Sequence, residues 1–120
     1  MQSKVLIIED NKQNMYMITY LLESYGYKVI QSFSGVDGII LAKEEMPDII
    51  LLDIQLPEMD GYAIARAIKK HEELKSIPII AVTSYAMPGD KEKAMGAGAI
   101  GYIEKPINPD TFIAQMKAFL

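Results

Sequence analysis

The chain alternates short apolar runs with segments of helical periodicity, and this alternation limits the folds that it can adopt. The apolar runs are, in order, Val5–Ile8, Val29–Ile30, Ile49–Leu52, Ile77–Val82 with a proline at its start, and a fifth around residues 100–103. Strands that alternate with helices favour βαβ units and a parallel sheet. Because the longer runs are apolar throughout, and do not alternate with polar residues, helices should cover both faces of that sheet.

Five helices are expected between and after these strands. They begin after Asn11, after Ser34, near Tyr62 and Pro88, and near Asn108, and the first four end near Gly26, Glu45, Lys70 and Gly96. Met15, Ile18, Leu22 and Tyr25 recur at spacings of three and four, which is typical of one helix face. Asn11 and Ser34 are residue types that cap helices. In the last helix, we expect Phe112, Met116, Phe119 and Leu120 to share a face.

Length and composition predict one domain over residues 1–120, with an ordinary globular core. The formal net charge of -4 argues against binding to nucleic acid, which needs a concentrated positive surface. The chain has no cysteine, so disulfides and thiolate metal sites are excluded. No apolar stretch approaches the ~20 residues of a membrane span. We therefore expect a soluble, cytoplasmic protein without membrane contact.

Four of the apolar runs lead into residues that can handle a phosphoryl group and a metal ion. These residues are Glu9 and Asp10, Asp53, Thr83 and Lys105. The carboxyl ends of neighbouring parallel strands lie on one edge of a sheet, where open α/β sheets place their sites. Three carboxylates brought together there would raise one another's pKa, and a divalent cation would relieve the conflict. Hard oxygen ligands without histidine or cysteine favour Mg²⁺.

The same edge would carry a clamp for a transferring phosphoryl group. Thr83 offers a hydroxyl and Lys105 a compact positive charge. Asp53 is the natural nucleophile, because it ends the central strand of the order 2-1-3-4-5, and its attack on phosphorus would give an aspartyl phosphate. Each residue alone also fits a structural role: a helix cap for Asp10, a turn for Thr83 and a solvated side chain for Lys105.

Four motifs in this order resemble the receiver domain of two-component response regulators. They are Ile8–Asn11, Leu52–Gly61, Val82–Ser84 and Tyr102–Pro106, and together they cover essentially the whole chain. The resemblance implies an α/β, flavodoxin-like fold, a doubly wound five-stranded parallel sheet of order 2-1-3-4-5. It also implies a signalling switch, with no more than weak intrinsic phosphotransfer and autodephosphorylation, in place of a true enzyme.

By this resemblance, Asp53 accepts a phosphoryl group from a histidine kinase or a histidine phosphotransfer protein. Glu9, Asp10 and Asp53 would bind Mg²⁺ together with the backbone carbonyl of Gln55. Gln55 and Tyr85, two residues past Asp53 and Thr83, occupy positions that influence dephosphorylation in the family.

The resemblance also assigns the switch. Thr83 and Lys105 would contact the phosphoryl group, and Tyr102 would turn inward when Thr83 moves toward it. The Lys105–Pro106 bond is often cis in this family. The surface of the last two helices and the fifth strand would then change shape and bind a downstream protein, as a monomer or a phosphorylation-promoted homodimer.

The chain further resembles the stand-alone regulators that control cell-division kinases, in segments Asp53–Glu58 and Thr83–Met87. The alternative is a receiver cut from a larger regulator or hybrid kinase. Two other classes of protein fit the sequence less well. A Mg²⁺-dependent phosphohydrolase with an aspartyl-phosphate intermediate usually has a second acid where this chain has Gln55. A flavodoxin-like electron carrier needs a phosphate-binding loop after the first strand, where Glu9 and Asp10 would repel phosphate.

Overall fold

The computed structural model describes residues 3–56, 60–84 and 89–120. Within these ranges, the strands are β1 (Lys4–Ile8), β2 (Lys28–Ser32), β3 (Ile49–Asp53), β4 (Ile79–Thr83) and β5 (Gly101–Glu104). All neighbours pair in parallel, in the order β2-β1-β3-β4-β5. The predicted strand order is thus confirmed.

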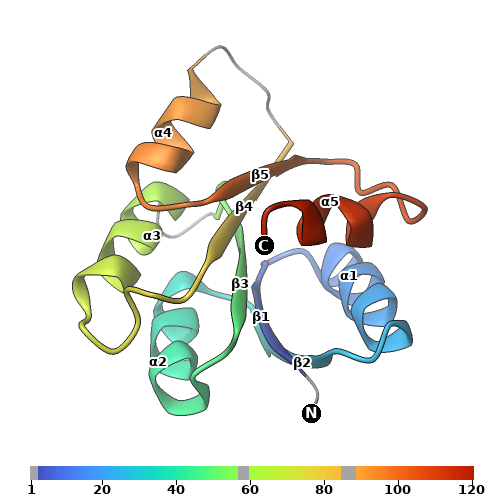
Figure 1. Ribbon diagram of the computed structural model, residues 1–120, viewed down its shortest axis with the longest axis horizontal. Coiled ribbons are helices and arrows are strands. Elements are labelled where there is room, and N and C mark those ends of the chain that lie inside the picture. Colours follow the sequence, from blue (N-terminus) through green and yellow to red (C-terminus); the bar gives the residue numbers. More distant parts are fainter. Residues whose placement is uncertain (1–2, 57–59, 85–88) are drawn as a thin grey trace.

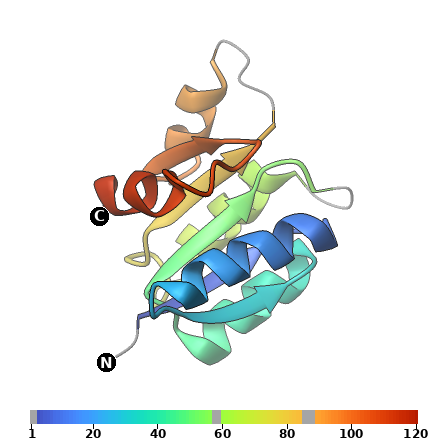
Figure 2. The ribbon, with the colours of Figure 1, turned by 90° about the vertical axis from the view of Figure 1, so that its right-hand side faces the viewer.

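Helices cover both faces of this sheet, as the apolar strands predict. They are α1 (Lys12–Ser24), α2 (Gly35–Glu45), α3 (Gly61–Lys70), α4 (Asp90–Gly96) and α5 (Phe112–Ala118). Figure 1 shows α1 and α5 on one side of the strands and α2, α3 and α4 on the other. In Figure 2 the molecule is turned so that α1 and α5 lie in front of the sheet.

Two apolar clusters fill the space between the sheet and its helices. One joins alternate side chains of β1, β3 and β4 to α2, α3 and α4, with Leu6, Leu52 and Ile64 among its members. The other joins the remaining strand side chains to α1 and α5, with Ile7, Leu51 and Phe112 among its members. Successive strand residues point to opposite faces, so β3 and β4 are buried along their whole length.

The predicted helix signals hold for α1 and α2. The Asn11 side chain accepts a hydrogen bond from the backbone N–H of Asn14 at 2.9 Å. Ser34 Oγ accepts one from the N–H of Asp37 at 3.2 Å. After α1, Gly26 adopts a φ of +88°, a left-handed conformation that glycine tolerates best.

The predicted starts of the fourth strand and the last helix are wrong. β4 begins at Ile79, because the N–H of Ile77 bonds to the turn before it and Pro78 has no N–H. α5 begins at Phe112 and not at Asn108, since the Asn108 side chain accepts from the N–H of Asp110 in a preceding turn.

The apolar face predicted for α5 is only half buried. Phe112 and Met116 are fully buried, whereas Phe119 and Leu120, which follow the end of the helix, are 37% and 59% exposed. Pro88, expected in the first turn of the fourth helix, lies outside the described residues. None of the helices in the described ranges is both long and apolar enough to cross a membrane.

Candidate functional site

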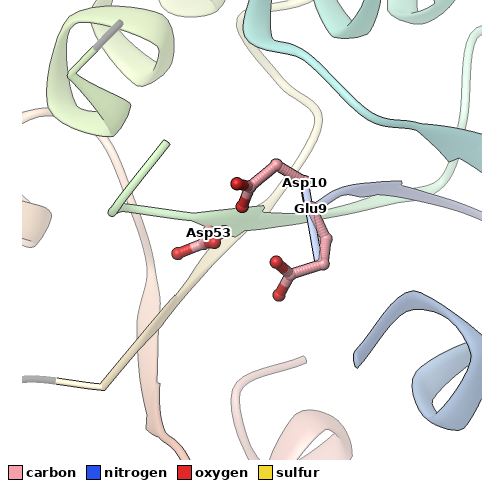
Figure 3. Close-up of side chains that lie close together, drawn as sticks. All are labelled: Glu9, Asp10 and Asp53. Atoms are coloured by element: carbon pink, nitrogen blue, oxygen red, sulfur yellow. The ribbon is translucent and has the colours of Figure 1, made fainter. Parts of the chain in front are cut away.

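Three carboxylates meet at the carboxyl ends of β1 and β3. Glu9 and Asp10 directly follow β1, and Asp53 is the last residue of β3. One oxygen from each lies within 4.8 Å of the others, and Figure 3 shows the three side chains grouped at the strand ends. Glu9 and Asp53 are only 2% and 4% exposed, whereas Asp10 is open to solvent. The parallel sheet therefore brings these acids together as the sequence predicts.

Lys105 reaches this cluster from the chain after β5. Its Nζ lies 2.7 Å from Glu9 Oε1 and 3.3 Å from Asp53 Oδ2, and the side chain is 10% exposed. The backbone N–H of Lys105 donates to the carbonyl of Thr83 at 2.7 Å, which ties this segment to β4. The Lys105–Pro106 bond is cis, as predicted. One ammonium thus bridges two buried carboxylates and offsets their repulsion.

The carboxyl group of Glu9 has a raised pKa. Burial raises its pKa to about 7, and the charge of Asp53 acts in the same direction. The Lys105 ammonium and the N–H of Asn11, which donates to Glu9 Oε2 at 3.1 Å, oppose this rise. Among the described residues, the buried Oε1 makes no hydrogen bond that would supplement its ion pair with Lys105. This cluster of three carboxylates offers hard oxygen ligands of the kind that a divalent cation such as Mg²⁺ prefers.

The neutral residues of the site lie around Asp53. The N–H of Gln55 donates to Asp53 Oδ1 at 2.9 Å. Thr83 is the last residue of β4, the strand beside β3, and is almost fully buried. The next N–H, of Ser84, donates to the side-chain Oε1 of Gln55 at 3.0 Å. The sequence carried no signal for this last contact, because it joins two loops through a side chain.

Tyr102 lies on β5, the edge strand that pairs with β4. It is half-buried in β5 and packs against the cluster on the α2, α3 and α4 side of the sheet. Burial, together with the carboxylates of Asp90 and Glu104, raises the pKa of its hydroxyl. Tyr85, which the resemblance associates with dephosphorylation, lies outside the described residues.

A parallel sheet of order 2-1-3-4-5, with an acid cluster and a lysine at its carboxyl edge, defines the class of response-regulator receivers. The model of the response regulator receiver domain family matches residues 5–117, and the chain belongs to this family. The alternatives of a phosphohydrolase and an electron carrier are therefore set aside.

Among particular proteins, the chain is similar to the polar-differentiation response regulator DivK. The protein of that name from Brucella ovis is 45% identical over 120 residues, which cover all of this chain and 98% of the relative. The one from Brucella anthropi is 43% identical over the same coverage. These relatives are little longer than one receiver domain, which supports the resemblance to stand-alone regulators.

Solved structures show the same fold. The chemotaxis protein CheY4 of Vibrio cholerae superposes with a TM-score of 0.95 at 28% identity, over the whole of both chains. The receiver domain of the sensor histidine kinase PA1611 from Pseudomonas aeruginosa has a TM-score of 0.89 at 33% identity, covering 99% of this chain and 98% of that one. The latter structure has a magnesium ion coordinated in its active site cleft. The chain is thus a response-regulator receiver of two-component signal transduction.

Proposed function

We propose that Asp53 accepts a phosphoryl group from a phosphohistidine on a histidine kinase or a histidine phosphotransfer protein. The observation that carries this proposal is that the Lys105 ammonium contacts both Asp53 and Glu9, and that all three of these side chains are largely buried. Such a cation can exchange a carboxylate for a phosphoryl oxygen without leaving the site.

The proposed transfer forms one bond and breaks another. An oxygen of the Asp53 carboxylate attacks phosphorus, the phosphorus–nitrogen bond of the phosphohistidine breaks, and the imidazole leaves with the electron pair. Both oxygens of the Asp53 carboxylate are oriented by a contact, since Oδ1 accepts a hydrogen bond from the N–H of Gln55 and Oδ2 lies 3.3 Å from Lys105 Nζ. The hydroxyl of Thr83, at the end of the adjacent strand, would donate a hydrogen bond to the phosphoryl group.

Mg²⁺ is the proposed cofactor. Glu9, Asp10 and Asp53 would hold it, together with the backbone carbonyl of Gln55, and their carboxylates lie close enough to share one ion. The ion would neutralise phosphoryl charge during transfer. Support comes from the three grouped carboxylates, which are hard oxygen ligands, and from the magnesium in the PA1611 receiver domain.

The proposed switch couples Thr83 to Tyr102. A phosphoryl group on Asp53 adds negative charge and acceptor oxygens beside Thr83. A shift of Thr83 toward that group would open space that the half-buried Tyr102 ring can enter. β5 lies next to β4 in the sheet, so the two residues sit on neighbouring strands.

The output surface is proposed on α4, β5 and α5. Four large apolar side chains are exposed on or beside these elements, namely Met95, Ile100, Phe119 and Leu120. Exposed apolar side chains can be buried in a protein interface when a partner binds. Three further expectations stay predictions. They are one domain over residues 1–120, a cytoplasmic location, and a monomer or a phosphorylation-promoted homodimer.

The direct experiment is incubation with Mg²⁺ and a small acyl phosphate, followed by intact-mass measurement. We expect a gain of one phosphoryl group that requires Mg²⁺ and is lost in Asp53→Asn. The matched control is Asp110→Asn, which changes an exposed aspartate in the segment before α5 and should keep the gain. A gain in Asp53→Asn equal to that of the wild type would refute Asp53 as the acceptor.

A further inference from the structure

Gln55 connects two loops of the site through its backbone and its side chain. Its N–H donates to Asp53 Oδ1 at 2.9 Å, which ties the residue to the carboxylate that ends β3. Its side-chain Oε1 accepts from the N–H of Ser84 at 3.0 Å, across 29 residues of sequence. Ser84 directly follows Thr83, the last residue of β4. One residue therefore links the end of β3 to the exit of β4.

The side-chain bond lies just past the end of the regular ladder between these strands. The ladder ends with the N–H of Ile54 donating to the carbonyl of Val82 at 3.0 Å. Ser84 lies two residues further on and is exposed, so its N–H would otherwise face water. The Gln55 amide thus extends the connection between β3 and β4 by one hydrogen bond beyond the sheet.

We propose that Gln55 is a positioning residue. The hydrogen bond from the N–H of Ser84 to its side-chain Oε1, called the latch below, holds Ser84 and thereby Thr83 in the positions that they occupy when Asp53 carries no phosphoryl group. The inference rests on the proposed function, in which Thr83 moves toward a phosphoryl group on Asp53. Thr83 and Ser84 share a peptide bond, and the proposal is that the movement of Thr83 turns the N–H of Ser84 away from Gln55 and so breaks the latch. The latch therefore opposes the switch. Its strength sets the free energy that binding of the phosphoryl group must contribute to drive the switch.

The chemistry of the side chain makes the latch testable. Methionine has nearly the length of glutamine but no strong acceptor, so Gln55→Met removes the latch and keeps the bulk. Glutamate keeps an acceptor oxygen at the same reach, so Gln55→Glu should keep it. Both variants retain the backbone N–H that bonds to Asp53 and the backbone carbonyl. The matched control is Gln31→Met, which changes an exposed glutamine on β2 that bonds to Thr19.

The first measurement is amide hydrogen exchange of Ser84 by NMR, in the protein without Mg²⁺ or phosphate. A hydrogen bond of ordinary net strength predicts exchange about fivefold faster in Gln55→Met. Exchange should stay near the wild-type rate in Gln55→Glu and Gln31→Met. An unchanged rate in Gln55→Met would overturn the latch, whatever the protein does with phosphate.

The second measurement tests the coupling to Thr83. The probe is beryllium fluoride with Mg²⁺, a mimic of the phosphoryl group, titrated by NMR. Without a latch to break, Gln55→Met should bind the probe about fivefold more tightly, and Gln31→Met should match the wild type. Faster Ser84 exchange with unchanged affinity would overturn the positioning role. A wild type that takes neither beryllium fluoride nor phosphate would refute the proposed function and the positioning role that rests on it, and Ser84 exchange would still decide whether the latch exists.

Discussion

Replacing Lys105 by methionine tests whether one ammonium stabilises the buried acids. Lys105 Nζ lies 2.7 Å from Glu9 Oε1 and 3.3 Å from Asp53 Oδ2. At an effective dielectric constant of about 20, unit charges at these distances attract by about 6 and about 5 kcal/mol. Methionine has a similar length and no charge, so the substitution removes both attractions with little change in packing.

The net effect is smaller than these gross energies, because lysine also loses hydration in the folded protein. Removing one partner of a buried ion pair typically costs about 3–5 kcal/mol. We expect the lower end, about 3 kcal/mol of unfolding free energy, since Glu9 can take up a proton. Its pKa is already raised to about 7 by burial, and it should rise further when the ammonium is gone.

The assay is urea denaturation in a chelating buffer at about pH 8.5, which is above the raised pKa of Glu9 in the wild type, so that Glu9 is ionised. The matched control is Lys117→Met, which changes an exposed lysine on α5 and should lose less than about 0.5 kcal/mol. At about pH 6 the deficit of Lys105→Met should shrink, because a protonated Glu9 no longer needs a cation. A loss at pH 8.5 no larger than that of the control would refute the reasoning.

Three further predictions concern the folded state without ligands. In Gly61→Ala, the new Cβ would lie 2.8 Å and 2.9 Å from the backbone oxygens of Ile54 and Asp53, and we expect urea denaturation to show a loss of about 2 kcal/mol. In chelating buffer, the raised pKa of Glu9 should lower the unfolding free energy of the wild type by about 3 kcal/mol as the pH rises from 4.5 to about 7. In Glu9→Gln, the unfolding free energy should lack most of this dependence on pH. In Ser34→Ala, loss of the cap of α2 should cost about 1 kcal/mol in thermal or urea unfolding, and no measurable loss would show that the cap bond is not stabilising.

The fold could be predicted because its signals are local. Strands that are apolar at every position indicate that helices bury both faces of the sheet, and every residue of β3 and β4 is buried. Caps such as Asn11 act within one turn of their own position. The start of α5 was missed because Asn108 has the chemistry of a helix cap and of a turn alike, and only its contact with Asp110 decides between them.

For the site, strand ends predict where residues gather but not what each side chain touches. Parallel pairing fixes the backbone of Glu9 and Asp53 beside each other, so their meeting followed from the strand order. Lys105 and Gln55 have long, flexible side chains, and the position of the backbone leaves several partners within reach of each. The bridge from Lys105 to two acids and the bond from Gln55 to Ser84 are therefore properties of the packed structure. Substitutions at these two positions keep the strands and change single contacts, so they can test the proposed switch without disrupting the fold.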